Sequence, residues 1–320
     1  MQSLCPPLIS VIIPVYNAEN TIRKSLSEIT EQSLQDIEVI CINDGSTDSS
    51  GRILDDLARN DERIIVLHQE NKGAGAARNA GLKIARGKYL SILDADDIFK
   101  ANMLSRAVSV AETDDLDIVV FRSDAYYPES EKYKSAAWTI HEDLLPSHRV
   151  FAGIDVQRDV FKVFVGWAWD KLFRTDFVRE NGLSFQEIRT TNDMLFVLSA
   201  VVLAKRISVI HDVLIHHVKQ SEGTLSVTRE KSWHCFHEAL SALKERLISE
   251  KLYGRFEQDY INYCVHASLW NINTLAEPSK SKLLEKLRGE WAEEMGIISK
   301  ERDYFYHKKE YQAFMDIVFD

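Results

Sequence analysis

The feature that most constrains the fold is a regular alternation of short apolar runs and helix-like segments over the first 120 residues. Apolar, often β-branched runs predict strands at residues 8–15, 36–43, 63–68, 88–93 and 116–122. Between them, apolar side chains recur at helical spacing, which predicts helices at residues 19–31, 48–60, 75–86 and 101–112. Repeated β-α units of this kind form a doubly wound, mostly parallel sheet. Ligands of such sheets bind at the carboxyl ends of the strands.

The rest of the chain is less regular and then helical. Residues 121–228 contain a predicted helix at 193–204, a strand at 207–218, a short helix at 158–164 and a loop-like stretch around Tyr126–Pro128. From residue 229 to 320 the periodicity is helical throughout. We therefore expect three parts, at 1–120, 121–228 and 229–320, of which the last is a helical C-terminal region.

Charge and composition exclude several classes of protein. The chain of 320 residues carries a net charge of -10 and has a pI of about 5.5, which argues against a nucleic-acid binder that works by broad phosphate neutralisation. Its four cysteines show no spacing typical of a zinc site or a disulfide framework. No run of about 18 apolar residues occurs, so no membrane span is expected. These patterns predict a cytoplasmic protein.

Carboxylates cluster directly after the predicted strand at 88–93. Asp94, Asp96 and Asp97 follow the apolar run, and unpaired charge at the end of a buried strand is costly. A divalent cation binds several oxygen ligands at once, and a diphosphate could complete its coordination shell. The alternative is that Asp96 or Asp97 caps the next helix, which leaves Asp94 unexplained. The cluster predicts a metal or nucleotide site.

Two other strands end in residues suited to a nucleobase. Tyr16 could stack on a base, Asn17 could bond a ribose or base edge, and Asp44 could accept the imide N–H of uracil. Ordinary turns are the competing interpretation, since Asp-Gly-Ser is favourable turn chemistry. A loop of small residues at 73–75 opens a helix and could approach a phosphate, but it lacks the third glycine of a dinucleotide site.

Taken together and in this order, these motifs resemble the signature series of glycosyltransferase family 2. The matching segments are Pro14–Asn17, Asn43–Asp48, Asn71–Gly73, Ala77–Gly81 and Leu93–Asp97. The resemblance implies a GT-A fold, in which 1–120 binds the nucleotide sugar and 121–228 binds the acceptor. It also implies a nucleotide-sugar donor, usually UDP-linked, and a Mn²⁺ or Mg²⁺ ion.

The resemblance also implies roles for single residues on the donor side. Asp44 would bind the base, Asp94 would lie near the ribose, and Asp96 would carry the metal. His217 is expected to complete the metal shell, and a solvated pair with His216 is the alternative. The remaining residues expected around the donor are Pro14, Tyr16, Asn17, Glu19, Ser46, Lys72, Gly73, Arg78 and Ala95.

On the acceptor side, the family's acidic motif is matched by Asn192 and Asp193. Asn192 stands where the family commonly has glutamate, so its acceptor-orienting role is open. The resemblance implies that Asp193 is the catalytic base; the alternative is a helix-start residue favoured by the helix dipole. Trp167 and Trp169 are expected to line the acceptor or donor pocket, with plain buried packing as the alternative.

These roles predict an inverting transfer of a hexose or N-acetylhexosamine from a UDP-sugar to a hydroxyl of a glycan, lipid-linked or protein acceptor. The implied setting is cell-envelope or surface polysaccharide biosynthesis, at the inner face of the membrane. The alternatives are a non-catalytic nucleotide-sugar-binding protein and a sugar nucleotidyltransferase; the latter would want a glycine-rich basic loop after the first strand. Residues 229–320 could hold the acceptor, a second copy of the chain or a membrane surface.

Overall fold

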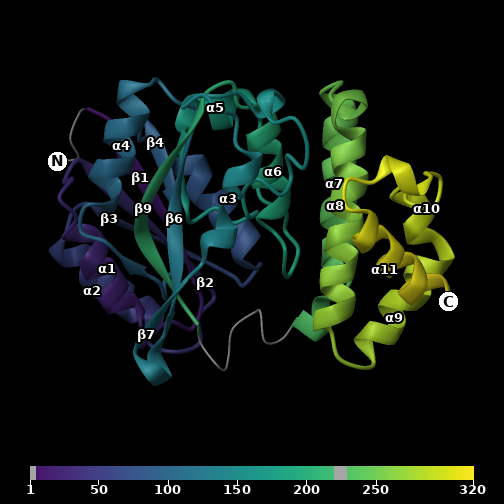
Figure 1. Cartoon of the computed structure of the whole chain (residues 1–320). Helices are drawn as coiled ribbons and strands as arrows, with labels where there is room; N and C mark the ends of the chain where they lie inside the picture. The colour runs from purple at the N-terminus through teal and green to yellow at the C-terminus, as the bar shows by residue number, and fades with distance from the viewer. Residues whose placement is uncertain (1–4, 220–228) are drawn as a thin grey trace.

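The computed structural model describes residues 5–219 and 229–320. A mixed sheet forms its centre, with the strand order β3-β2-β1-β4-β8-β6-β9-β5 and with β7 paired to β6 (Figure 1). The strands are β1 (Ile9–Val15), β2 (Ile37–Asp44), β3 (Ile64–Gln69), β4 (Tyr89–Ile92), β5 (Ile98–Phe99), β6 (Ile118–Tyr127), β7 (Lys132–Ser135), β8 (Lys171–Arg174) and β9 (Ile207–Val218).

Most of the long pairings in this sheet are parallel, as the sequence predicts. β1 runs parallel to both β2 and β4, β2 is parallel to β3, and β6 is parallel to β9. β8 is the exception in the middle, because it runs antiparallel to β4 on one side and to β6 on the other. A strand from residues 121–228 thus joins the two parts of one sheet.

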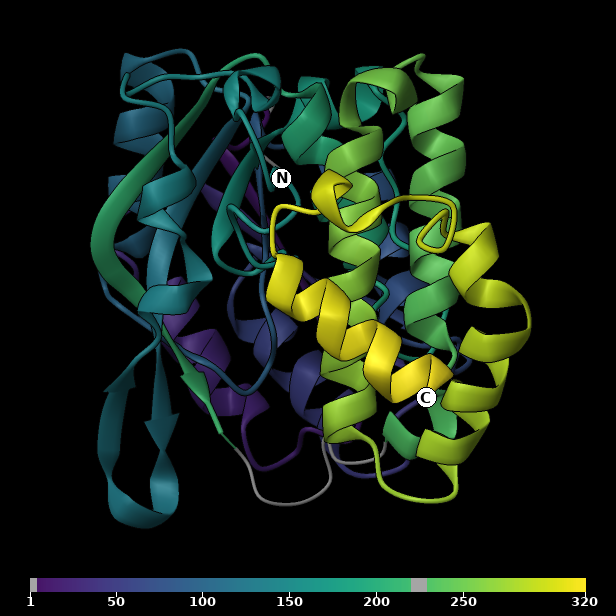
Figure 2. The same cartoon turned by 45° about the vertical axis from the view of Figure 1, so that its right-hand side comes forward.

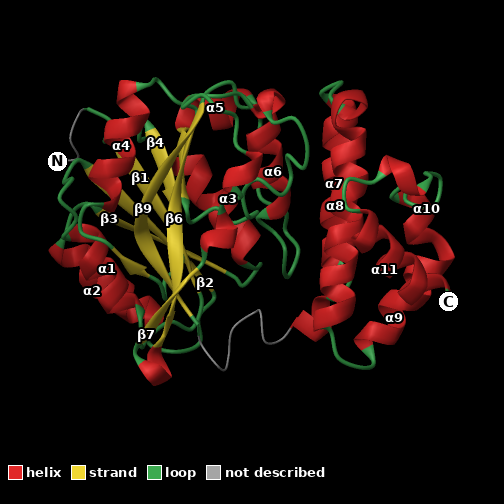
Figure 3. Ribbon diagram, in the orientation of Figure 1, coloured by secondary structure: helices red, strands yellow, loops and turns green. Residues whose placement is uncertain are grey.

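Helices cover both faces of the sheet (Figure 3). Side chains alternate along a strand, so Ile9, Val11 and Ile13 of β1 join the core on one face, whereas Ile12 joins the other. The first face is covered by α1 (Ile22–Thr30), α2 (Ser50–Asn60) and α4 (Met103–Thr113). The second is covered by α3 (Ala74–Ile84), α5 (Thr175–Glu180) and α6 (Met194–Leu203).

The C-terminal region is helical, as predicted, and its long helices stand beside the α/β part of the chain (Figure 2). Apolar residues of α6 and of the C-terminal helices belong to one continuous core. Within the described ranges, no helix is both long and apolar enough to cross a membrane. The helices are α7 (Cys235–Ser249), α8 (Tyr253–Thr274), α9 (Ser279–Lys286), α10 (Ala292–Glu294) and α11 (Lys308–Phe319).

Two local predictions are wrong. The helix expected at 158–164 is a single turn, because Asp159 has a left-handed backbone with φ of 53° that a right-handed helix excludes. The apolar spacing there reflects burial of Phe161 and Phe164 rather than helix. The loop expected around Tyr126 is instead the end of β6, which pairs with both β7 and β9.

Close backbone packing between α3 and the acceptor half generates a stability prediction. A Cβ atom at Gly75 would lie 2.0 Å from the carbonyl oxygen of Gln186. We expect Gly75→Ala to lower the free energy of unfolding by about 1–3 kcal/mol, measured by urea denaturation. The control is Gly254→Ala, because a Cβ at that exposed helical position meets no atom within 4 Å; it should leave stability unchanged or slightly higher. Equal effects of the two substitutions would contradict the prediction.

Candidate active site

Loops that follow β1, β2 and β4 meet at one edge of the sheet. β1 pairs with β2 as far as Val15 and Asn43, but with β4 only as far as Ile12 and Ile92. Pro14 lies past the end of the pairing with β4. Because no strand pairs with it on that side, its missing N–H costs no hydrogen bond of the sheet. The sequence-predicted segments at 14–19, 43–48 and 93–97 therefore reach the same edge.

The loops after β1 and β2 are joined by hydrogen bonds. The Asn17 N–H donates to Ser46 Oγ at 3.0 Å, and the Thr47 N–H donates to Asn17 Oδ1 at 2.8 Å. Glu19 accepts the Ser49 N–H at 2.9 Å. Asn17, Ser46 and Glu19 thus shape the edge, whereas the Tyr16 side chain is 54% exposed beside them.

Asp44 anchors the turn before α3. Its carboxylate is buried and accepts the backbone N–H groups of Lys72 and Gly73, both at 2.8 Å, and Gln69 Nε2 at 2.7 Å. Gly73 has a φ of 87°, which suits glycine. An ionised carboxylate can accept about four hydrogen bonds, so Asp44 retains capacity for a ligand donor.

Arg78 is the buried centre of the site. One terminal nitrogen lies 2.8 Å from Asp94 Oδ1, and the other lies 2.8 Å from Asp193 Oδ1 and 2.6 Å from Asn192 Oδ1. Arg78 was expected at the donor and Asn192 at the acceptor, but both are buried and bonded to each other. A single guanidinium therefore joins the end of β4 to the start of α6.

The electrostatics of this cluster depend on the balance between burial and ion pairing. Burial opposes the charge of Arg78, yet Asp193 and Asp94 together hold the pKa of its guanidinium above the ordinary value. Burial raises the pKa of the Asp193 carboxyl, and the charge of Arg78 only partly offsets this. The backbone N–H of Ala168 also lowers this pKa. Asp193 stands at the start of α6, where the helix dipole favours a negative charge, but its side chain makes no capping hydrogen bond.

Three acidic residues and a histidine form a second cluster. β5 pairs with β9 so that Ile98 opposes His216, and this pairing brings Asp97 within 2.9 Å of His217 Nδ1. Asp97 also accepts the Val218 N–H at 3.0 Å. Asp97 therefore binds two residues of β9 and does not cap a helix. Burial and the charges of Asp94 and Asp97 raise the pKa of Asp96 to about 7.

The donor set of this cluster fits a divalent cation. Within the described part of the chain, the buried Asp97 Oδ2 accepts no hydrogen bond. Burial, and after it the charges of Asp94 and Asp97, disfavours the ionised form of Asp96, and a cation would relieve this. Asp97 holds His217 by Nδ1, which leaves Nε2 as the ring nitrogen for a metal. Carboxylate and imidazole ligands suit Mn²⁺, and Mg²⁺ is commonly bound by one or two carboxylates together with substrate phosphates.

A tighter grouping of metal-ligating atoms occurs elsewhere. Of the residues that the structure describes, only His234, Cys235 and Glu238 place three such atoms within 4.8 Å of one another. They lie at the start of α7, where His234 and Glu238 form an ion pair across one helical turn. Asp96 and His217 do not belong to so closed a set, which is consistent with a cation shared with a ligand.

Aromatic rings border the histidine. Trp167 and Trp169 stack at 4.8 Å between ring centroids, and Trp169 stacks on His217 at 5.2 Å. The two tryptophans share a face, although they lie in the loop before β8 rather than on a strand. Trp169 is buried and Trp167 is partly exposed.

Sequence reasoning missed the fully buried pair Asp170 and Lys171. Lys171 Nζ donates to the carbonyl oxygens of Val165 and Trp167 at 2.9 and 2.8 Å, and to Asp170 Oδ1 at 2.5 Å. All three ammonium hydrogens are thereby used, and the loop that carries Trp167 and the Ala168 N–H is held in place. The sequence does contain a signal for this pair, because two adjacent charged residues interrupt the apolar, aromatic stretch at 167–173.

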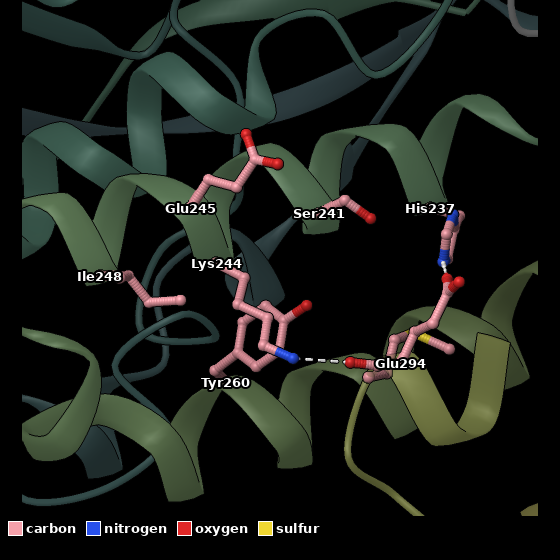
Figure 4. Close-up of a pocket in the computed structure, with 8 residues that line it drawn as sticks. His237, Ser241, Lys244, Glu245, Ile248, Tyr260 and Glu294 are labelled. Carbon is pink, nitrogen blue, oxygen red and sulfur yellow. Dashed lines mark hydrogen bonds and ion pairs between the residues drawn. The ribbon is translucent and has the colours of Figure 1, made fainter.

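One cavity of the described structure lies away from these residues. It has a volume of about 390 Å³ and is lined by side chains of α7, α8 and the 294–295 segment (Figure 4). Lys244 Nζ donates to the Glu294 carbonyl oxygen at 2.7 Å, and His237 lies 3.1 Å from the Glu294 carboxylate. Because its cationic groups already have partners and none of the predicted residues lines it, this cavity is not the candidate site.

Comparisons with solved structures place the fold. The structure of S. aureus TarS residues 1–349 in complex with UDP matches with a TM-score of 0.69 and 18% identity, covering 97% of this chain and 88% of that one. The mannosyltransferase PcManGT from Pyrobaculum calidifontis, in complex with GDP-Man and Mn²⁺, matches with a TM-score of 0.56 and 17% identity over 98% and 88% of the two chains. The fold is that of GT-A glycosyltransferases.

Sequence comparison identifies the family. The family model "Glycosyl transferase family 2" matches residues 10–182, more than half of the chain. The glycosyltransferase EpsJ of Bacillus subtilis is 36% identical over 213 residues, which cover 65% of this chain and 60% of EpsJ. The chain belongs to glycosyltransferase family 2, and the predicted resemblance is confirmed.

Breaking the buried pair should destabilise the protein strongly. Lys171→Met leaves the Asp170 carboxylate buried without its partner, so we expect a loss of about 3–5 kcal/mol in the free energy of unfolding, measured by urea denaturation. The control is Lys286→Met, which removes an exposed lysine paired with Glu290 on one helix and should not shift the midpoint. A Lys171→Met midpoint equal to that of the wild type would show that the pair is not needed for folding.

Proposed function

We propose that the protein is an inverting glycosyltransferase that moves a hexose or N-acetylhexosamine from a UDP-sugar to an acceptor hydroxyl. The observation that carries this proposal is the Arg78 bridge, which sets Asp193 of the acceptor half beside Asp94 of the donor half. A buried carboxylate next to a donor-side carboxylate cluster is the arrangement that a transfer between two substrates requires.

Several residues support a UDP-linked donor. TarS, which shares the fold, forms complexes with UDP and with UDP-GlcNAc. In this chain, Asp44 retains acceptor capacity for the imide N–H of uracil, and the exposed ring of Tyr16 lies at the same edge for stacking on the base. We propose that Asp94 lies near the ribose, since its second oxygen is not the one that contacts Arg78.

Asp193 is proposed as the base that takes the proton of the acceptor hydroxyl. A free aspartate has a pKa of about 3.9 and is a weak base, so the raised pKa of Asp193 favours this role. Arg78 orients the carboxylate through the hydrogen bond to Asp193 Oδ1. The hydroxyl oxygen then attacks the anomeric carbon from the face opposite the nucleotide, which inverts the configuration there.

Asp96 and His217 are the residues that would hold Mn²⁺ or Mg²⁺. When bound, such an ion supplies charge stabilisation for the departing diphosphate. The complex of PcManGT with GDP-Man and Mn²⁺ supports a metal in this fold. The acceptor is proposed to be a hydroxyl of a glycan, lipid-linked or protein acceptor of the cell envelope, in keeping with family membership.

A donor screen tests the proposal directly. Purified protein is incubated with UDP-glucose, UDP-galactose, UDP-GlcNAc and UDP-GalNAc, with Mn²⁺ or with EDTA, and UDP release is measured. We expect release from one or two donors, at least tenfold slower with EDTA. Absence of both UDP release and metal-dependent UDP binding across the panel would overturn the proposal.

The assigned base gives a sharper prediction. Asp193→Asn keeps the size and hydrogen bonds of the side chain but cannot take a proton, so turnover should fall by about 10²–10⁴-fold. Binding of UDP with Mn²⁺, measured by calorimetry, should be unchanged. Asp212→Asn, at an exposed ion pair with Arg106, is the control and should keep full turnover. Full turnover of Asp193→Asn would move the base to another residue.

The pH dependence of turnover follows from the same residue. The base acts when deprotonated, so kcat should fall as the pH drops through the raised pKa of Asp193. Arg78 lowers that pKa by its charge, and Arg78→Met should therefore move the acid limb of the profile to higher pH. Arg106→Met, at the exposed pair, should leave the profile in place. An acid limb that Arg78→Met shifts to lower pH would contradict this account.

A further inference from the structure

A row of four aromatic rings leads from the candidate metal ligand to the surface. His217 stacks on Trp169 with 5.2 Å between centroids, Trp169 stacks on Trp167 at 4.8 Å, and Trp138 meets Trp167 edge-on at 5.4 Å. Exposure rises along the row, from 4% at Trp169 to 53% at Trp138. The outermost ring therefore offers an apolar face to solvent directly beside the site.

The backbone holds Trp138 in this position. It lies in the short 3₁₀ turn Ala137–Thr139, and the Thr139 carbonyl oxygen accepts the Val165 N–H at 3.1 Å. Ile140 and Phe164 form an antiparallel bridge next to it. Trp138 is thus tied to the same loop that carries Trp167.

That loop also lies against the start of α6. A Cβ added at Gly166 would be 3.9 Å from the Cα atom of Met194, the residue after Asp193, and Lys171 Nζ donates to the Trp167 carbonyl oxygen at 2.8 Å. An acceptor whose reacting hydroxyl lies at Asp193 would therefore have Trp167 as a near neighbour. Trp138 is one ring further out along the row.

The chemistry of an exposed indole limits the class of ligand that can bind there. A tryptophan offers a large, rigid apolar face at low entropic cost, together with an N–H donor at its edge. A pyranose ring matches this, because its C–H groups form an apolar face and its hydroxyls point outward at the rim. The face of Trp138 is suited to such a ring rather than to an anionic group, because the face of an aromatic ring carries partial negative charge.

We propose that Trp138 forms an outer acceptor subsite, which stacks on the sugar unit next to the one that carries the reacting hydroxyl. The inference rests on the glycosyl transfer proposed above and deepens it: the acceptor is an oligosaccharide of at least two units rather than a single sugar or a peptide side chain. Trp138 positions this second unit and takes no part in the chemical step.

The test compares acceptor length in three proteins: the wild type, Trp138→Ala and Trp270→Ala. Trp270 is the matched control, since it is 55% exposed on α8 in the C-terminal region. The probes are gluco-, galacto- and N-acetylglucosamine-configured oligosaccharides of one to four units, and their affinities are measured by calorimetry with UDP and Mn²⁺ present.

We expect at least one series to bind the wild type and Trp270→Ala about tenfold more tightly at two units than at one, the scale of burying one aromatic face. Trp138→Ala should lose that gain, and Trp138→Phe should retain part of it. A gain that survives in Trp138→Ala, or no gain with length in any series for the wild type, overturns the subsite.

Failure of the subsite can be told apart from failure of the proposed function. UDP binding in the presence of Mn²⁺ and UDP release from the donor panel report on the donor site, and neither requires a second sugar unit. Loss of both in the wild type would refute the transferase. Their presence without a gain from acceptor length would refute the Trp138 subsite alone.

Discussion

The buried guanidinium of Arg78 is the interaction on which the rest of the site depends. It contacts Asp94 after β4 and both Asn192 and Asp193 before α6, segments about a hundred residues apart. Without this cation, two partly buried carboxylates would face each other unpaired, which is unfavourable. The bridge therefore has two effects. Its positive charge allows Asp94 and Asp193 to lie close together, and its hydrogen bond orients the proposed base before any substrate binds.

A second buried cation, Lys171, orders the loop before β8 in a similar way. Lys171 uses its whole hydrogen-bonding capacity to hold the loop of Trp167 and Ala168, and this loop lies against the start of α6. The proposed base is thus bonded by Arg78 of α3, and the loop beside it is held by Lys171 of β8. Asn192, which departs from the family's usual glutamate, fits this setting, since a further carboxylate beside Arg78 would add uncompensated charge to a buried cluster.

Much of the donor side could be predicted from the sequence, because local patterns determine it. β1 to β4 follow from short apolar runs, and Tyr16, Asp44 and Asp94 lie at or within two residues of the ends of those strands. Contacts between distant segments could not be predicted. No local sequence pattern indicates that Arg78 contacts Asp193, or that Trp138 contacts Trp167. The turn at 158–164 failed for a related reason, since tertiary burial of Phe161 imitates helical spacing. The family resemblance predicted a role for Asp193, whereas only the structure shows which residues surround it.

The antiparallel strand β8 has a consequence for how the chain folds. Until Lys171–Arg174 is in place, β4 is bonded only to β1, so its other side is an open edge of the kind that recruits foreign strands. Filling that edge needs contacts across some eighty residues, which are slow to form. β4, the strand that precedes the carboxylates at 94–97, is therefore exposed to pairing with other chains until residues 171–174 have been synthesised.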